Sequence, residues 1–258
     1  MVKLPKYKPF LSLDKQINHL ERNKNVVFEN RRKARNYLLN KNYFNIVSTA
    51  KIIFCDGIVD SKHNYSKPSN FSAWQIYYEN ERKLAFSFLK ILYDFENQFN
   101  SRLAYYTSEL LAGDLLVERE VAAIYKYINR TMKARNKYHG EETWEFITKF
   151  MFAESIGLYK LICTFYHERA KAKKQPEVID RYCNKICNVS LKKLNEYRNL
   201  RNCISHNTPL NVYLTAGKNK RLYTYRASII TEIAPVEDTI FVEYLLTTAR
   251  NYIDMWTK

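Results

Sequence analysis

Residues 84–110 read LAFSFLKILYDFENQFNSRLAYYTSEL, and this stretch decides the class of fold. Its apolar side chains recur every three or four residues, at Leu84, Phe88, Ile91, Leu92, Phe95, Phe99, Leu103, Tyr106 and Leu110. That spacing predicts one long amphipathic helix with a single broad buried face. A helix of this length forms the axis of a bundle. We therefore predict an all-α, mostly helical fold.

Helical patterns continue on both sides of this axis. Before it, they run from the N-cap Ser12 through Leu20 and then cover about 28–40 and 43–56. After Gly113-Asp114, they cover about 115–137, 143–167, 177–206 and 237–256. Polar residues 57–70 predict a loop, and strand-like residues around the turn Gly217-Lys-Asn-Lys220 predict a small basic β-hairpin near 211–233. We expect two domains, a basic N-terminal helical module over 1–65 and a helical domain over 66–258.

Positive charge is concentrated at the start of the chain. The net charge is +16, and residues 1–50 hold eleven Lys and Arg against three acids, a net of +8. This excess favours a polyanionic partner, nucleic acid before a membrane. The 21 tyrosines can also stack on bases and bond to phosphates. The alternative is a solubilising surface, although balanced charge would serve solubility as well.

Composition also bears on compartment and cofactors. No segment has the order of a signal peptide, and no apolar run approaches the roughly 18 residues that span a bilayer. The five cysteines are scattered, which fits a reducing cytoplasm. We expect no metal and no cofactor, because glycine-rich phosphate loops are missing and Cys183 and Cys187 lack a second Cys/His pair. The acidic pairs look like solvated helix faces, namely Glu118 with Glu120 and Glu141 with Glu142.

The stretch Arg201-Asn-Cys-Ile-Ser-His206 carries the chemistry that we predict. An arginine fork can hold a phosphate, and a histidine that titrates near neutral pH can move the proton of a ribose 2′-hydroxyl. Asn202 can orient the ribose or the histidine. Such a set would cut RNA without a metal ion. The alternative is a partly buried histidine at a helix end with surface arginines nearby.

Helix geometry sets a condition on this pair. On a straight helix Arg201 and His206 point about 140° apart, so they do not converge while the helix is regular. Thr208-Pro209 disfavours helix at Thr208, which places His206 in the last turn. A distorted end lets the imidazole approach the arginine, and a twofold dimer would supply two of each residue. We therefore expect a homodimer.

On these motifs the sequence resembles the Abi-like (abortive infection, AbiD/AbiF type) bacterial proteins of the HEPN superfamily, over most of its length. The matching segments are Lys8-Pro-Phe-Leu-Ser-Leu-Asp-Lys-Gln-Ile-Asn-His-Leu20, Tyr37-Leu38-Leu39, Asn42-Tyr43-Phe44, Asp94-Phe-Glu-Asn-Gln-Phe-Asn-Ser-Arg-Leu-Ala-Tyr105, Trp144-Glu-Phe-Ile with Phe152, and Leu200-Arg-Asn-Cys-Ile-Ser-His206. The chain departs from the family pattern at Asn207, where many members have a second histidine. It also departs at Leu210, where members often carry a tryptophan.

The resemblance implies a HEPN-type helical bundle for the 66–258 domain and an antiviral or toxin–antitoxin ribonuclease. It also implies a small structured non-coding RNA as partner. We expect Arg201 and His206 to be catalytic, with Asn202 supporting them and Arg198 assisting with phosphate.

Other residues are expected around this centre and on the RNA-binding surface. Glu96 and Arg102 can reach the same pocket from the long helix, or they form an internal ion pair. The remaining RNA-binding residues that we expect are Arg31, Arg32, Lys33, Arg35, Lys218, Lys220 and Arg221. Two alternatives stay open: a non-catalytic RNA-binding protein of the same fold, and an antitoxin or scaffold whose partner is a protein.

The basic first 50 residues predict RNA binding that is dominated by phosphate contacts. The affinity for RNA should fall by about 0.7–0.9 log unit per log unit of salt for each phosphate neutralised. Reversing Arg31, Arg32 and Arg35 to Glu should weaken binding, as measured by a salt titration of the dissociation constant. Salt-insensitive binding, or normal binding by the triple variant, would show that this segment is not the RNA surface.

Overall fold

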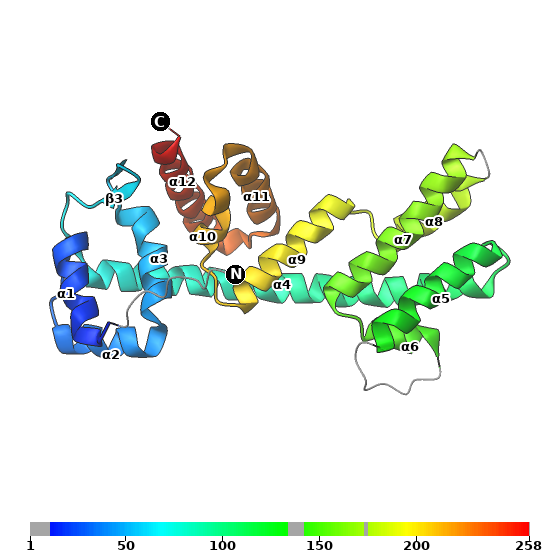
Figure 1. Ribbon diagram of the computed structural model, residues 1–258, viewed down its shortest axis with the longest axis horizontal. Helices are drawn as coiled ribbons and strands as arrows, with labels where there is room; N and C mark the ends of the chain where they lie inside the picture. Colours follow the sequence, from blue (N-terminus) through cyan, green and yellow to red (C-terminus); the bar gives the residue numbers. More distant parts are fainter. Residues whose placement is uncertain (1–10, 134–141, 173–174, 258) are drawn as a thin grey trace, which may run out of the picture. The chain divides into compact units, whose positions relative to one another are not determined.

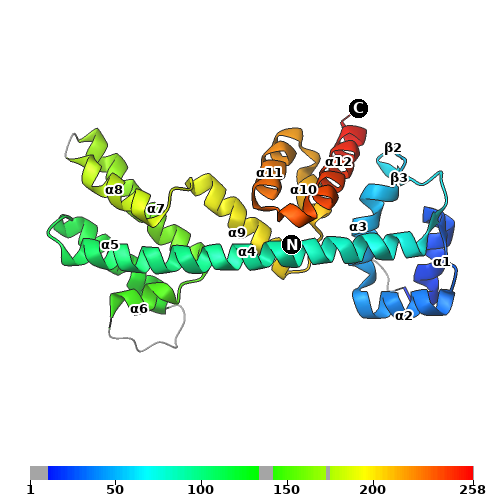
Figure 2. The same ribbon diagram turned by 180° about the vertical axis from the view of Figure 1, so that it is seen from behind.

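The protein is all-α in a computed structural model that describes residues 11–133, 142–172 and 175–257. Figure 1 and Figure 2 show its elements from opposite sides, and helices make up most of both views. Within the described residues, the strands form two small sheets of two strands each. The predicted class of fold is therefore confirmed. Lys8-Pro9 and Glu141, which the sequence analysis singled out, lie outside the described residues.

The chain folds as two units. The first combines Met1–Phe88 with Cys203–Lys258, and the second is Leu89–Asn202. Two helices, α4 (Phe71–Ala112) and α9 (Leu191–Ser205), run through the boundaries between them. The boundary predicted between residues 65 and 66 falls inside the first unit, and that division into domains stays a prediction.

Short polar side chains begin several helices of the first unit. Ser12, the predicted N-cap, accepts the N–H of Lys15 at 3.4 Å, and Asn30 and Asn42 begin α2 and α3 in the same way. The elements in chain order are α1 (Leu13–Lys24), β1 (Val26–Val27), α2 (Arg31–Lys41), α3 (Tyr43–Phe54), β2 (Gly57–Val59), β3 (Lys62–Asn64), β4 (Ser69–Asn70), the start of α4, the end of α9, α10 (Leu210–Thr215), η1 (Ala216–Lys218), α11 (Lys220–Ile233), η2 (Val236–Asp238) and α12 (Thr239–Trp256).

The N-terminal part of this unit packs around the start of α4. Trp74 is fully buried there, and its indole N–H donates to the Ser69 hydroxyl at 3.0 Å. Its ring stacks on Phe54 with the centroids 5.6 Å apart. The buried residues that complete this core are Ile17, Leu20, Val26, Ala34, Leu38, Ile46, Ala50, Phe71 and Tyr78. Ile17, Leu20 and Leu38 are therefore core residues of this unit, whereas Leu39 on α2 is exposed.

The prediction of a β-hairpin near 211–233 is wrong, because this segment forms helices. Asn219 begins α11 by accepting the N–H of Leu222 at 3.0 Å, and Gly217 turns the chain before it with φ of +75°. The β-branched and aromatic residues suggested strands, but Ile229 and Ile230 bury one face of α11. Helix capping and burial on one side therefore overrode intrinsic β-propensity.

A hairpin is instead found in 57–64, where the sequence predicted a loop. β2 and β3 are antiparallel, with Gly57 opposite Asn64 and Val59 opposite Lys62. The two residues of the turn, Asp60 and Ser61, both have positive φ, as a two-residue hairpin turn requires. Because neither residue is a glycine, the usual sequence signal of such a turn was missing.

A buried carboxyl group closes the N-terminal end of α10. Glu81 on α4 is 2% exposed, and its Oε1 accepts the backbone N–H of Asn211 at 2.7 Å. Asn211 is fully buried and donates from Nδ2 to the carbonyl of Thr49 on α3 at 2.8 Å. Burial raises the pKa of Glu81 to about 7, although the N–H groups of Asn211 and Leu210 act in the opposite direction. These bonds join α3, α4 and α10 within the first unit.

The second unit is built on aromatic contacts with the rest of α4. Phe99 meets Tyr159 edge to face with the centroids 5.7 Å apart, and Phe95 meets Tyr197 in the same way at 5.1 Å. Phe88 and Phe99 of the predicted apolar face are therefore buried and Phe95 is half-buried, whereas Phe86, which lies off that face, is exposed. The other elements of this unit are α5 (Glu118–Lys133), α6 (Thr143–Thr148), α7 (Phe152–Lys171), α8 (Pro176–Ile186) and most of α9.

Two predicted helices of this unit are each divided in two. The segment 143–167 breaks before α7, where the carboxylate of Glu154 accepts the N–H of Met151 at 2.7 Å. The segment 177–206 breaks before α9, where Ser190 accepts the N–H of Lys193 at 3.3 Å. Both contacts supply acceptors for the unsatisfied N–H groups at a helix start. The hydrophobic periodicity continues across both breaks and therefore predicted single helices, whereas local capping begins a new helix at each break.

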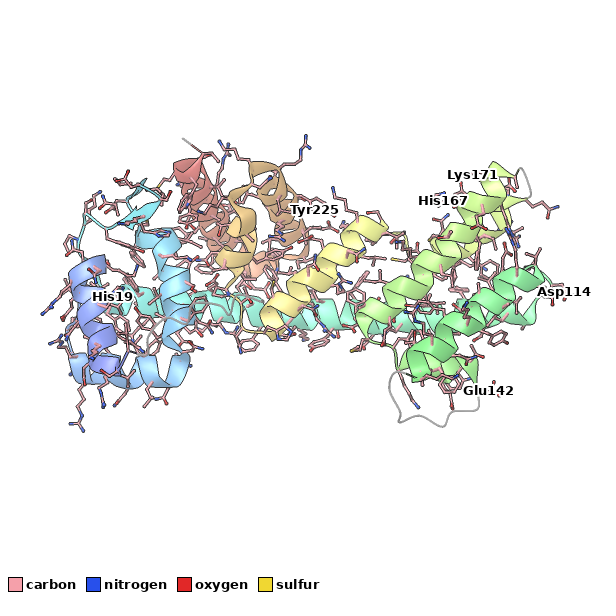
Figure 3. All side chains as sticks on the ribbon, in the orientation of Figure 1. His19, Asp114, Glu142, His167, Lys171 and Tyr225 are labelled. Atoms are coloured by element: carbon pink, nitrogen blue, oxygen red, sulfur yellow. The ribbon has the colours of Figure 1, made fainter. Side chains whose placement is uncertain are left out.

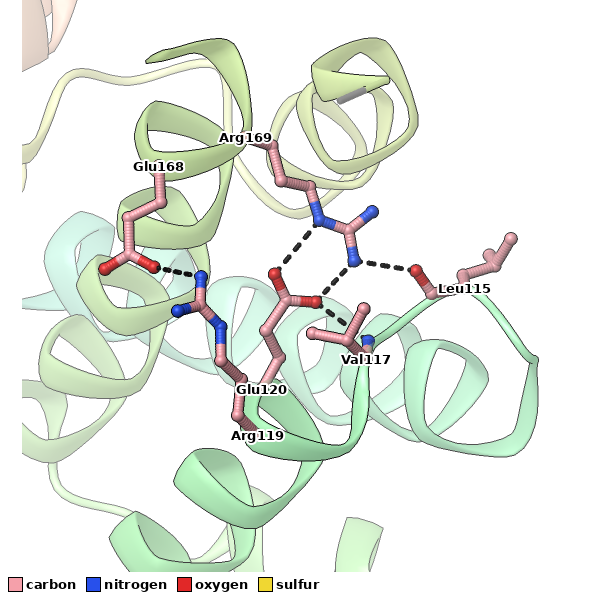
Figure 4. A network of polar contacts seen from close by, with 6 residues as sticks. All are labelled: Leu115, Val117, Arg119, Glu120, Glu168 and Arg169. Atoms are coloured by element: carbon pink, nitrogen blue, oxygen red, sulfur yellow. Dashed lines mark hydrogen bonds and ion pairs between the residues drawn. The ribbon is translucent and has the colours of Figure 1, made fainter. Parts of the chain in front are cut away.

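Glu120 is not on a solvated helix face, which corrects the sequence interpretation. It is 2% exposed and forms an ion pair with Arg169 of α7. Arg169 also donates to the carbonyl of Leu115 at 2.9 Å, as Figure 4 shows. Burial acts to raise the pKa of Glu120, but the hydrogen bonds from Arg169 and from the N–H of Val117 outweigh it, and the pKa is lowered. This ion pair connects α5 with α7.

Within the described ranges, no helix combines the length and the apolar composition that crossing a bilayer requires.

We predict that Glu81 makes stability depend on pH. The unfolded carboxyl releases its proton near pH 4.5, whereas the folded one keeps it until about pH 7. Folding therefore takes up a proton in this window, and the free energy of unfolding should fall as the pH rises through it. Denaturant unfolding from pH 4.5 to 8 should show this decrease, and Glu81→Gln should remove it. Glu79→Gln, on the same helix, is the control and should leave the decrease in place.

Candidate catalytic motif and nucleic-acid interface

Arg201 lies on α9, and its side chain is held by several neighbours. Nη2 lies 3.2 Å from Oε1 and 3.1 Å from Oε2 of Glu96, and Nη1 donates to Oδ1 of Asn202 at 3.0 Å. The guanidinium carbon lies 5.3 Å from the ring centroid of Tyr93. The Arg201 side chain is 24% exposed and that of Glu96 is 8% exposed. The predicted supporting residue Asn202 and the predicted neighbour Glu96 therefore both contact Arg201.

Arg102 does not share this environment. It is exposed, whereas Glu96 is buried. The two residues are six apart on α4, which turns them about 240° around the helix axis. The alternative of an internal ion pair between Glu96 and Arg102 is wrong, because the arginine that Glu96 contacts is Arg201. The pairing joins residues 105 positions apart, so spacing along the helix carried no signal for it.

His206 follows the last residue of α9, so the predicted end of the helix is confirmed to within one residue. The N–H of Thr208 donates to the carbonyl of Cys203 at 2.8 Å, and the N–H of Asn207 donates to that of Ile204 at 2.9 Å. Asn207 has φ of +57°. Together these features form a Schellman motif with His206 at the C-cap. Its side chain is exposed.

The division between the two units falls between the two predicted catalytic residues. Arg201 belongs to the second unit and His206 to the first. Both lie within the last turns of α9 and its cap, and α9 is regular through Ser205. The convergence of their side chains on one phosphate therefore stays a prediction.

The basic residues expected on α2 lie at its first turns, and all four are exposed: Arg31, Arg32, Lys33 and Arg35. Arg31 donates to Glu21 and to Asn18 at 2.6 Å each, and Arg35 lies 3.7 Å from Asp14. Because exposed ion pairs are weak, these contacts with α1 leave the arginines available to an anion.

The basic residues expected on a hairpin surround the start of α11 instead. Lys220 pairs with Asp254 at 2.8 Å, Lys218 lies over the ring of Trp256, and Arg221 is exposed. Arg198 lies on α9, is half-buried, and donates to Oδ1 of the adjacent Asn199 at 3.4 Å. The predicted RNA-binding residues therefore fall in separate places along the chain.

The other histidines have settings unlike that of His206. His19 on α1 contacts Asn23 through Nδ1 at 2.8 Å, and His167 is exposed on α7; Figure 3 labels both. His63 is half-buried on β3, and His139 lies outside the described residues. Among the described side chains, no three His, Cys, Asp or Glu are grouped so that they could hold a metal ion.

Comparison of the chain with protein-family models, with curated proteins and with solved structures found no significant match.

We predict that Glu96 and Arg201 are energetically coupled. Removing one partner leaves a largely buried charge without its counterion, so each single alanine variant should be less stable than the wild type. A double-mutant cycle on Glu96→Ala and Arg201→Ala should give a coupling free energy of about 1–2 kcal/mol in denaturant unfolding. The matched cycle with Arg102→Ala in place of Arg201→Ala should give a value near zero. Equal coupling in both cycles would contradict the pairing described above.

Proposed function

We propose that this protein is an RNA-binding endoribonuclease of the HEPN type, which acts in bacterial antiphage defence as an abortive-infection or toxin–antitoxin protein. The observation that carries the proposal is the end of α9, where a tethered arginine is followed within five residues by an exposed histidine at the helix cap. This is the chemistry that cleavage of RNA without a metal ion requires. The resemblance to Abi-like proteins adds the biological setting.

In the proposed reaction His206 accepts the proton of a ribose 2′-hydroxyl. The 2′-oxygen attacks the adjacent phosphorus, and the bond from phosphorus to the 5′-oxygen breaks. The leaving 5′-oxygen takes up a proton, and the products are a 2′,3′-cyclic phosphate and a 5′-hydroxyl end. In the homodimer that we propose, the second copy of His206 supplies this proton.

Arg201 stabilises the negative charge that develops on the phosphate oxygens. Its contacts with Glu96 and Asn202 restrict the guanidinium before the substrate arrives, and such preorganisation is how fixed charges contribute to catalysis. Because the Arg201 side chain is 24% exposed, part of it faces solvent. Glu96 is a positioning residue in this scheme, and Arg198 on the same helix assists with phosphate.

Binding of the RNA itself rests on the basic residues. Arg32 and Lys33 are exposed at the start of α2, and Arg221 is exposed at the start of α11. Cations on a helix N-terminus meet the partial positive charge of the backbone, so a phosphate there relieves an unfavourable arrangement. We propose a small structured non-coding RNA as the partner that these residues hold.

One observation favours a second function, that of a non-catalytic RNA-binding protein with the same fold. Two nitrogens of the Arg201 guanidinium are already bonded to Glu96 and Asn202. These contacts would also be expected of an arginine whose sole role is to brace α9 against α4 inside the second unit. The basic residues would then bind RNA without cutting it.

We predict metal-independent cleavage that needs the 2′-hydroxyl. EDTA should leave the reaction intact, and a deoxyribose at the cut site should block it because the nucleophile is gone. His206→Ala or Arg201→Ala should abolish cleavage of the RNA that co-purifies with the protein, while folding and RNA binding are kept. His167→Ala removes an exposed imidazole on α7 and should cleave normally. Cleavage that requires magnesium, or that persists in well-folded His206→Ala, would favour the non-catalytic function.

A further inference from the structure

A second group of basic residues lies in the first unit and shares no residue with the motif at the end of α9. It combines Lys24 at the end of α1, Lys51 on α3, His63 on β3 and Lys218 in η1. Only Lys218 among these residues was predicted from the sequence as a binding residue. They come from four segments that are far apart in the chain, so their grouping is a product of the tertiary fold.

An aromatic frame holds this group in place. His63 stacks on Tyr252 with the centroids 5.8 Å apart, and its Nε2 is hydrogen-bonded to the Tyr252 hydroxyl at 2.7 Å. Trp256 meets the His63 ring edge-on at 5.7 Å. On the other side, Lys24 donates to the hydroxyl of Tyr65 at 3.1 Å and lies over its ring. The frame fixes the imidazole between α12 and the hairpin.

The charges that act on His63 are all positive. Burial, and after it the positive charges of Lys51, Lys24 and Lys218, together lower the pKa of His63 to about 4. Burial also lowers the pKa of Lys24, and the nearby Lys51 adds to this effect. Bringing like charges together is unfavourable, and an anion placed among them removes the repulsion.

Two carboxylates of the first unit, Asp254 and Asp56, contact neighbouring segments. Asp254 pairs with Lys220 at 2.8 Å. Asp56 accepts the N–H of Ser66 at 2.6 Å and that of Lys67 at 3.0 Å. These carboxylates are therefore anchored to α11 and to the chain that follows β3.

The backbone around Lys218 is shaped to present its ammonium group. Gly217 and Lys218 both have positive φ, at +75° and +50°. Lysine rarely adopts this conformation, and such strained residues cluster at sites of function. The turn places the Lys218 ammonium over the ring of Trp256, 2.8 Å from its centroid. A Cβ on Gly217 would meet no atom within 4 Å, so the space beside the turn is open.

That space belongs to a cavity of about 300 Å³. Its lining residues include the cations Lys51 and Lys218, the aromatic Tyr252 and the apolar Ile52 and Val212. The cations suit a phosphate, and the apolar and aromatic walls suit the flat base or sugar attached to it. A cavity of this volume is larger than a bare phosphate ion needs.

We propose that this cavity binds a nucleotide, with Lys51 and Lys218 holding its phosphate beside His63. The nucleotide is either a free mononucleotide or one unit of a bound RNA. Arg201 and His206 take no part in this site, so the inference stands whether or not the protein cleaves RNA. It would make the first unit a sensor of nucleotides or a second point of contact for RNA.

The test uses the full-length protein with AMP as the free nucleotide and a short single-stranded RNA as the polymer. Each ligand is titrated by calorimetry against the wild type and against the double variant Lys51→Gln, Lys218→Gln. Affinity for at least one ligand should fall by about tenfold or more, since two charge-assisted contacts are lost. Lys62→Gln is the matched control. Lys62 neighbours His63 on the exposed side of β3, so its loss should change affinity less than about twofold.

The ligand that loses affinity in the double variant shows whether the cavity binds a free nucleotide or one unit of an RNA chain. A loss confined to AMP identifies a free nucleotide, and a loss confined to RNA identifies a unit of the polymer. Unchanged affinity for both ligands in a folded double variant would overturn the proposal. An equal loss of affinity in Lys62→Gln would also overturn it, because the loss would then come from the lower net positive charge and not from the cavity. If inorganic phosphate binds as tightly as AMP, the cavity does not recognise a nucleotide. Repeating the titrations with His206→Ala should give wild-type affinities, which keeps this result distinct from the cleavage test.

Discussion

The first unit depends on one buried polar contact, the carboxyl group of Glu81 at the start of α10. An uncapped helix start inside a protein leaves N–H groups without partners, and each such group costs free energy. Glu81 accepts the N–H of Asn211, and Asn211 in turn donates to Thr49. The chain after α9 is thereby fixed onto α3 and α4. Everything that follows α10, including the turn at Gly217, inherits its position from this contact.

The second unit depends on a different kind of contact, an ion pair with one largely buried partner. Glu96 lies on the face of α4 that turns toward α9, and Arg201 reaches it from α9. The aromatic rings of Phe95 and Tyr197 pack beside the pair and hold the two helices at contact distance. The Arg201 guanidinium is thus fixed by the same packing that forms the core, which is what a phosphate-binding group in a ribonuclease needs. The same fixed guanidinium also braces α9 against α4.

Charge is used in two ways in this protein. On α2, arginines stand in solvent at the positive end of a helix, where the long-range attraction of a polyanion is strongest. In the cavity that we propose for a nucleotide, the half-buried Lys51 and the exposed Lys218 lie beside aromatic and apolar walls, where contact with a single phosphate would be more selective. Exposed cations favour fast, salt-sensitive association, whereas partly enclosed ones favour recognition of a particular group. The RNA-binding function that we propose would use both.

The sequence by itself determined the class of fold, the long helix from Leu84 to Leu110 and the end of α9 near His206, because periodicity and capping are local properties. It placed a hairpin near 211–233 wrongly, since β-branched residues read alike in a strand and on the buried face of a helix. Only the tertiary structure decided that Glu96 contacts Arg201, that Glu120 is buried, and which lysines surround His63. Such pairings join residues far apart in the chain, and they are set by packing, which no local pattern encodes.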